Sequence, residues 1–282
     1  MAEITAEAVR ALRERTDLPM MECKKALIEA NGDQDLAVKI LKEKVKGFKE
    51  KSKDRVTSEG RVATLTAPDG SAAVMIELQC ESAPVARGED FTFLCDQLTK
   101  QLLNGPGAKT PEELLSQPAP DRPGMTLAEL HEEVMNKIRE NIVLARVLKV
   151  AGPVAGYSHH DGSLGVLFQV SGANGKAEVI RDVAMHIAAM NPTVCLPSEL
   201  DPAVVAAEKD RLTAEAKASG KPDNIIEKMV GGKMRTFYAS EGVLTAQGFA
   251  KDDTKTVEKA LADAGLTAVT YTRWRLGQPA AM

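Results

Sequence analysis

The strongest constraint on the fold is a duplicated pattern in the middle of the chain. A Gly-x-Val-Ala run, an Asp-Gly-Ser turn and an apolar run follow one another from Gly60 to Leu78, and the series returns with the same spacing from Gly152 to Val170. Alternating and β-branched residues around an Asp-Gly dipeptide are typical of a β-hairpin. An amphipathic pattern follows each copy, at 91–103 and 179–190, and predicts a helix. The sequence therefore predicts a core of two related α+β halves.

Two more helices are expected to interrupt the second half. Asp201 and Pro202 have the order of a helix cap and a first helical residue, Ser219–Pro222 ends that helix, and Asp223 is placed to cap the next. The apolar stripe of the second helix is thin. It favours a helical hairpin that projects from the body, at about 200–238, over two ordinary covering helices.

The remaining core segments are less regular. Residues 104–124 are rich in Gly and Pro and are expected to form an irregular surface loop, followed by a helix from Thr126 to about Asn141. Near the end of the chain, Thr254 to Ala264 predicts an amphipathic helix that Gly265 caps. Ala268 to Leu276 predicts a final strand.

Residues 9–44 read as a separate module of three helices. Its second helix opens on Met20 and Met21, at a tip where a polar residue would cost nothing. Methionine is adaptable at binding surfaces, but a module this small also needs every apolar side chain for its core. Spacing alone leaves both interpretations of the pair open.

Composition excludes several classes of function. The 282 residues carry 36 basic and 40 acidic side chains, and the net charge of -4 disfavours a nucleic-acid binder that works through its overall field. The one basic run, at 42–55, suits a solvated helix or linker, with RNA contact as the lesser alternative. Four cysteines without a CxxC pair indicate a reducing compartment. No apolar run reaches the roughly 18 residues of a membrane span, and the first residues do not resemble a targeting signal, so a cytoplasmic location without membrane contact is expected.

The sequence gives no support to an enzyme. His159, His160 and Asp161 could be imagined as a metal or catalytic site with the cysteines, but no HxxxH or CxxC spacing completes the set. Neither a P-loop nor a GxGxxG motif is present. No catalytic residue, metal ligand or cofactor is therefore expected.

Several segments closely resemble one known family. LRERT, MM, CKKAL and ANGD in the first module resemble the N-terminal ubiquitin-associated-like domain of bacterial translation elongation factor Ts. The runs ENIVLARV at 140–147, AMHIAAMNP at 184–192 and IEKMVGGKM at 226–234 are similar to later segments of that family. The resemblance implies an α+β protein with a helical domain and basic linker at 1–54, and core subdomains at 55–140 and 141–282. An antiparallel helical hairpin, a coiled coil, is inserted in the second subdomain.

The resemblance also implies a function. Family members are guanine-nucleotide exchange factors that bind elongation factor Tu in its GDP and nucleotide-free forms and disturb its magnesium and phosphate site. No direct contact with nucleic acid is implied, and the hairpin could support a homodimer or reach the partner. The residues that match partner-binding positions are Arg13, Met20, Met21, Arg87 and His186. For His186, a core histidine is an equally good interpretation.

One loop departs from the family pattern. Where the family has Thr-Asp-Phe-Val-Ala and a basic residue, with the Phe wedged near the partner's magnesium, this chain has Ser82, Ala83, Pro84 and Val85, then Ala86 and Arg87. Three interpretations are open. The loop acts as a smaller, rigid wedge, exchange depends on other contacts, or the chain binds elongation factor Tu without releasing GDP, as a chaperone-like protein would. Phe91 is expected to be a core residue and not a substitute wedge.

Overall fold

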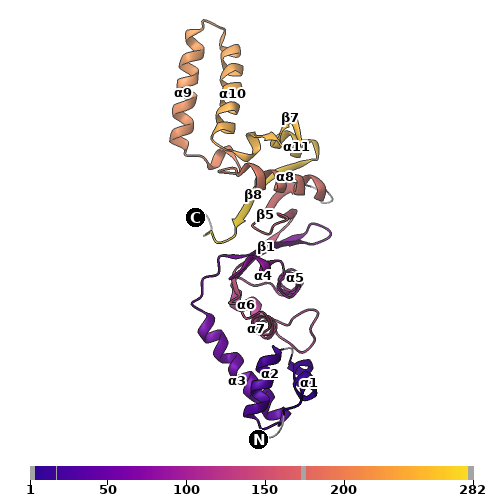
Figure 1. The fold of residues 1–282 in the computed structure, drawn as a ribbon. Coiled ribbons are helices and arrows are strands. Elements are labelled where there is room, and N and C mark those ends of the chain that lie inside the picture. Colours follow the sequence, from indigo (N-terminus) through magenta and orange to yellow (C-terminus); the bar gives the residue numbers. More distant parts are fainter. Residues whose placement is uncertain (1–3, 17, 173–175, 279–282) are drawn as a thin grey trace. The chain divides into compact units, whose positions relative to one another are not determined.

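The computed structural model describes residues 4–16, 18–172 and 176–278, apart from the side chains of 45–51. Helices and small antiparallel sheets make up the fold, which is α+β as predicted (Figure 1). The chain divides into two compact units. The first holds the residues up to Arg61 together with Ile76–Val147, and the second holds Val62–Met75 together with the residues from Leu148 onward. The chain is divided at three places, after Arg61, Met75 and Val147, and each of them falls within a strand.

The first unit begins with the three helices expected in residues 9–44. These are α1 (Ala6–Thr16), α2 (Met20–Glu29) and α3 (Gln34–Ser52), and the third continues into the basic run. Leu12, Leu27 and Leu41 are fully buried between them. The turn from α2 to α3 passes through Asn31 and Gly32, both at positive φ.

A three-stranded sheet follows, in the order β1-β2-β3. Its strands are β1 (Glu59–Thr66), β2 (Ala72–Cys80) and β3 (Val143–Ala151), and β3 had not been predicted. Between β2 and β3 lie α4 (Ala83–Ala86), α5 (Glu89–Asn104), α6 (Pro111–Leu115) and α7 (Leu127–Ile138). The expectation of an irregular loop at 104–124 is wrong in part, because Thr110 caps α6. Helix α7 starts at the predicted place, since Thr126 and Glu129 form a capping box, but it ends three residues early at a left-handed Arg139.

The second unit is built on an antiparallel sheet in the order β4-β5-β8. Its strands are β4 (Val154–Ser158), β5 (Leu164–Gly172) and β8 (Leu266–Arg275). Helix α8 (Ala177–Met190) packs on one face, where Val166, Phe168 and Ile187 share a core (Figure 1). On the other face, Leu167 packs with Val62 and other residues from the tip of the first hairpin.

The two hairpin turns confirm the duplication at atomic detail. Gly70 and Gly162 lie at φ 71° and 78°. Asp69 Oδ1 accepts the amide of Ser71 at 3.0 Å, and Asp161 Oδ1 accepts the amide of Ser163 at 2.8 Å. Hydrogen bonds from these serines lower the pKa of both carboxyl groups. The repeated tripeptide therefore forms the same turn twice.

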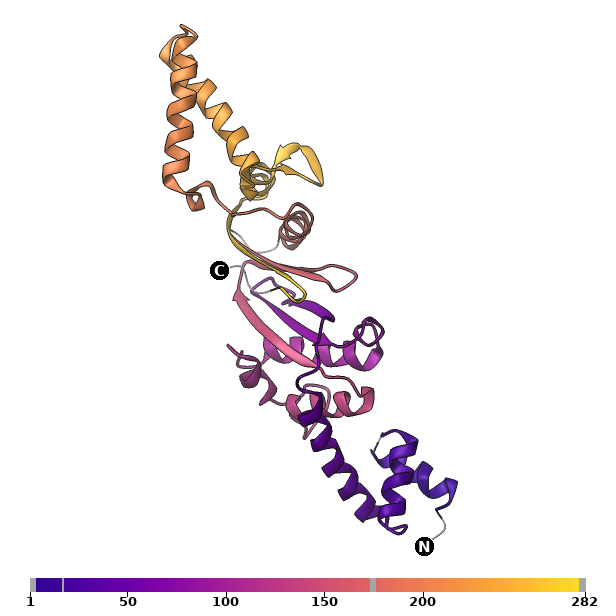
Figure 2. The ribbon, with the colours of Figure 1, turned by 60° about the vertical axis from the view of Figure 1, so that its left-hand side comes forward.

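The inserted hairpin consists of α9 (Pro202–Ala218) and α10 (Asp223–Ser240), which lie side by side in Figures 1 and 2. Asp201 caps α9 as predicted and accepts the amide of Ala203 at 2.8 Å. Asp223 does not cap α10, because it is already the first helical residue and Pro222 precedes it. Five buried side chains form the thin core between the helices, and these are Leu212, Ala216, Ile226, Val230 and Met234.

The last part of the chain is only partly as expected. Short turns η1 (Pro197–Glu199) and η2 (Leu244–Ala246) precede the small strands β6 (Gly248–Phe249) and β7 (Asp252–Thr256). The helix predicted from Thr254 is instead α11 (Val257–Asp263), because β7 pairs with β6 and Thr256 caps the helix. Strand β8 confirms the final strand. Within the described ranges, no helix is long and apolar enough to cross a membrane.

A buried ion pair joins β2 to β3. Arg146 Nε donates to Glu77 Oε2 at 2.6 Å, and the two side chains are 18% and 2% exposed. Arg146→Met is expected to lower the free energy of unfolding by about 3 kcal/mol, because it leaves the Glu77 charge buried without its guanidinium. Urea unfolding measures this, and replacing Glu77 by Met as well should recover most of the loss. A loss below about 1 kcal/mol in the single variant would contradict this role for the pair.

Candidate partner-binding site

The methionine pair lies on the solvent-facing side of α2. Met20 is 47% and Met21 62% exposed, while Cys23 and Leu27 on the same helix are fully buried. The pair therefore takes no part in the core of the helical module. Exposed neighbouring apolar side chains are typical of a protein-binding surface. This arrangement is compatible with the predicted role of both residues.

Helix α1, which packs against α2, carries several basic side chains. Arg13 is exposed on α1, one turn before the end of the helix. Arg15 is engaged within the module, where its guanidinium donates to Asp35 Oδ1 at 2.9 Å. Next to the methionines, Glu22 forms an ion pair with Arg139, the residue that ends α7. Arg13, like Arg10 on the same helix, is thus an exposed basic side chain of α1.

The loop at 82–87 folds as a single helical turn. Ser82 is extended, at φ -135°, and Ala83–Ala86 form α4 with Pro84 in its first turn. The amide of Ala86 donates to the carbonyl of Ser82 at 3.2 Å, and that of Gly88 donates to Val85 at 2.9 Å. Pro84 and Arg87 are exposed, whereas Ala86 is buried. Proline on the outer side of this turn is compatible with the smaller wedge considered from the sequence, which stays a prediction.

The start of this loop is held by a residue that sequence reasoning missed. Glu140 Oε2 accepts the amides of Glu81 and Ser82, both at 3.1 Å, and its Oε1 accepts the Ser82 hydroxyl at 2.5 Å. In return, Glu81 Oε1 accepts the amide of Asn141 at 2.6 Å. The only signal in the sequence was position, since Glu140 opens the family-like run at 140–147. Nothing in its spacing indicated contact with a loop so far back in the chain.

His186 lies in the core of the second unit and is 1% exposed. Its Nε2 donates to Gln247 Oε1 at 2.9 Å, and its Nδ1 accepts the amide of Ala250 at 3.2 Å. These partners fix a neutral ring with its proton on Nε2. Burial lowers the pKa of His186, although the bond to Gln247 opposes the shift. The core interpretation thus agrees with the structure, and the partner contact stays a prediction.

Phe91 and the cysteines are also core residues. Phe91 is fully buried on α5, as expected, and does not reach the surface near the loop. Burial raises the pKa of the Cys80 thiol to about 11 and those of Cys95 and Cys195 to about 12. Thiols with such pKa values are weak nucleophiles at neutral pH. Across the described residues, no group of three or more His, Cys, Asp or Glu side chains could hold a metal ion.

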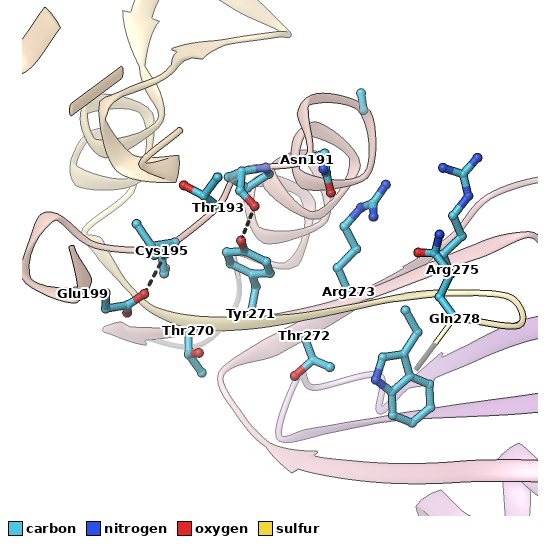
Figure 3. Close-up of a pocket in the computed structure, with 14 residues that line it drawn as sticks. Asn191, Thr193, Cys195, Glu199, Thr270, Tyr271, Thr272, Arg273, Arg275 and Gln278 are labelled. Carbon is cyan, nitrogen blue, oxygen red and sulfur yellow. Dashed lines mark hydrogen bonds between the residues drawn. The ribbon is translucent and has the colours of Figure 1, made fainter. Parts of the chain in front are cut away.

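A hollow of the second unit lies beside β8 and has a volume of about 760 Å³ (Figure 3). Tyr271 lines the hollow, and its hydroxyl donates to the carbonyl of Pro192 at 2.6 Å. Arg273 and Arg275 supply positive charge at one end. Burial raises the pKa of Tyr271 to about 12, so the phenol stays neutral. The partner-binding residues predicted from the sequence do not line this hollow.

The environment of His186 makes stability depend on pH. The unfolded chain binds a proton near the ordinary pKa of 6.5, whereas the folded ring binds it only at lower pH. Stability from the neutral ring is therefore complete above 6.5 and is lost as the pH falls towards the folded pKa. Between about pH 7.5 and about pH 5.5, the wild-type chain should lose more free energy of unfolding than His186→Gln, which does not titrate. Parallel losses in urea unfolding would contradict the assignment.

Comparisons with known proteins cover nearly the whole chain. Residues 81–278 match the family model described as elongation factor TS. An elongation factor Ts of Hyphomonas neptunium is 40% identical, over 99% of this chain and 93% of its own length. Proteins of the same name from Methylococcus capsulatus and from a Hydrogenobaculum species are 40% and 37% identical, and cover 98% and 97% of this chain, with 92% and 99% of their own lengths. The chain therefore belongs to the elongation factor Ts family of translation elongation factors.

Proposed function

We propose that this chain is the guanine-nucleotide exchange factor of elongation factor Tu. It binds the GDP form, disturbs the magnesium and phosphate site, and holds the nucleotide-free form until GTP enters. It acts in the cytoplasm, has no cofactor of its own and performs no covalent chemistry. The observation that carries the proposal is the rigid turn at 82–87, which presents Pro84 on the surface of a chain that belongs to this family.

Exchange of this kind is a coupling of two binding reactions. An exchange factor must weaken the affinity for nucleotide by the same factor by which the nucleotide weakens binding of the factor. It therefore needs contacts that only the distorted partner can satisfy. A loop that is already rigid suits this task, because little conformational entropy is lost when it meets the partner. Magnesium is an effective target, since it bridges phosphate oxygens to the protein.

The methionine pair and Arg13 would provide the first attachment. Met20 and Met21 offer exposed apolar surface that does not support the helical core, and burying one such side chain contributes about 2 kcal/mol. Arg13, on the neighbouring helix, would add a charged contact that selects an acidic patch. This attachment acts on both forms of the partner, whereas the loop at 82–87 would distinguish them. The hairpin α9–α10 is available for dimerisation or for a further contact with the partner.

A second function is supported by the same loop. Ala83 cannot accept the hydrogen bonds that a carboxylate accepts, and Pro84 buries less surface than a phenylalanine. A chain with these residues could bind elongation factor Tu without releasing GDP, as a chaperone-like protein would. The two functions share the attachment surface and differ in the effect on bound nucleotide.

Release of a fluorescent GDP analogue from elongation factor Tu separates them. Saturating wild-type chain is expected to accelerate release by at least about a hundredfold, which corresponds to about 3 kcal/mol off the activation free energy of release. Pro84→Gly, which frees the turn, should retain binding and lose much of that acceleration. A release rate equal to the spontaneous one would leave only the non-exchanging function. Full acceleration by Pro84→Gly would assign exchange to other contacts.

Replacing both methionines tests the attachment surface. Met20→Asp with Met21→Asp is expected to weaken binding to elongation factor Tu by about 3 kcal/mol, because two apolar anchors become charges that the interface would bury. Isothermal calorimetry measures the affinity, and circular dichroism checks the fold. Val56→Asp is a matched control, since Val56 is an exposed apolar residue outside this surface. Unchanged affinity in the folded double variant would exclude the pair from the interface.

A further inference from the structure

Two short segments of the first unit hold each other through their glutamates. Glu140 accepts the backbone amides of Glu81 and Ser82, and Glu81 accepts the backbone amide of Asn141. Each carboxylate thus accepts hydrogen bonds from the backbone of the other segment. Because the donors are backbone groups, the bonds fix the path of the chain at the entrance to α4 and do more than orient a side chain.

The position of Glu140 is fixed on both sides. Before it, Arg139 adopts a left-handed conformation at φ 65°, and its amide donates to the carbonyl of Met135 at 2.8 Å. After it, Asn141 is 4% exposed, and its side-chain amide donates to the carbonyl of Arg55 at 3.2 Å. The backbone on both sides of Glu140 is therefore held in place, and the hydrogen bonds of Glu140 tie the start of the loop at 82–87 to it.

The bonds made by Glu140 draw strength from the charge of its carboxylate. Its two oxygens accept three donors, and Ser82 contributes both its amide and its hydroxyl. An amide side chain of the same size could still accept both backbone amides through its oxygen and donate from its nitrogen to the Ser82 hydroxyl oxygen, but it carries no charge. Hydrogen bonds to an ionised acceptor are also about twice as strong as those between neutral groups. Glutamine at this position thus keeps the shape and replaces charge-assisted hydrogen bonds by weaker neutral ones.

We infer that Glu140 is a positioning residue for nucleotide release. It holds the first residues of the loop so that Pro84 stays on the outer side of a rigid turn, and it does so without contacting the partner. This inference rests on the proposed exchange function. The inference separates the rate of GDP release from the affinity for the partner. Loss of Glu140 should slow GDP release from the bound partner and leave the attachment through Met20 and Met21 unchanged.

The test is Glu140→Gln in the full-length chain, with Glu112→Gln as matched control. Glu112 is an exposed glutamate of α6, outside the loop and outside the methionine surface. Glu140→Gln is expected to lower the maximal rate of GDP release about tenfold, with a half-saturating concentration within about twofold of the wild type. Glu112→Gln should match the wild type in both. A wild-type maximal rate in Glu140→Gln would overturn the inference, as would a loss confined to the half-saturating concentration.

A second variant covers the case in which Glu140→Gln folds poorly. Ser82→Ala removes the hydroxyl bond and leaves both backbone bonds to Glu140. It should lower the maximal rate about threefold, and adding it to Glu140→Gln should lower the rate no further, because both changes act through one contact. Independent, additive effects would overturn the inference.

Amide hydrogen exchange separates failure of the inference from failure of the proposed function. If the wild-type chain does not accelerate GDP release, the proposed function is wrong. The contact between Glu140 and the loop can then still be tested by amide exchange in the free protein. The amides of Glu81 and Ser82 are expected to exchange at least about tenfold faster in Glu140→Gln than in the wild type or in Glu112→Gln. Equal exchange rates would overturn the inference.

Discussion

The second unit depends on a strand that is buried on both faces. In β5, Val166 and Phe168 face α8, while Leu167 faces the tip of the first hairpin. A side chain at Gly165 would collide with that tip, since its Cβ would lie 2.5 Å from Val62 Cγ1 and 2.9 Å from Met75 Sδ. A strand with apolar layers on both sides cannot slip by one residue without exposing one layer and crowding the other. The register of β5 thereby sets the places of β4 and β8.

Local signals in the sequence predicted much of the fold. The Asp-Gly-Ser turns and the cap at Asp201 act within a few residues, and the structure has them where the sequence indicated. The errors have non-local causes. β3 and β7 are defined by pairing with distant or weakly patterned strands, and α6 occupies a segment whose glycines and prolines concealed a capped helix.

The candidate site divides in the same way. The resemblance gave the positions of Met20, Met21 and the loop at 82–87, but it could not show which side chains are exposed. It left His186 open, because a helix histidine has the same spacing whether it faces solvent or donates to Gln247 in the core. Glu140 could not be found from spacing, since four helices separate it from its partners in the sequence. The methionine surface is thus defined by the exposure of its side chains. The loop at 82–87 is defined by hydrogen bonds to its backbone.

The thin core of α9 and α10 has a consequence for how the molecule loses structure. Five buried side chains hold two helices of 17 and 18 residues. Gly231 and Gly232 lie inside α10 with no atom near the place of a Cβ, and each glycine lowers helix stability by about 1 kcal/mol relative to alanine. The hairpin is therefore expected to open as a separate cooperative segment, at a lower free energy than the sheet from which it projects. Partial unfolding would then begin at the hairpin and leave the methionine surface and the loop at 82–87 folded.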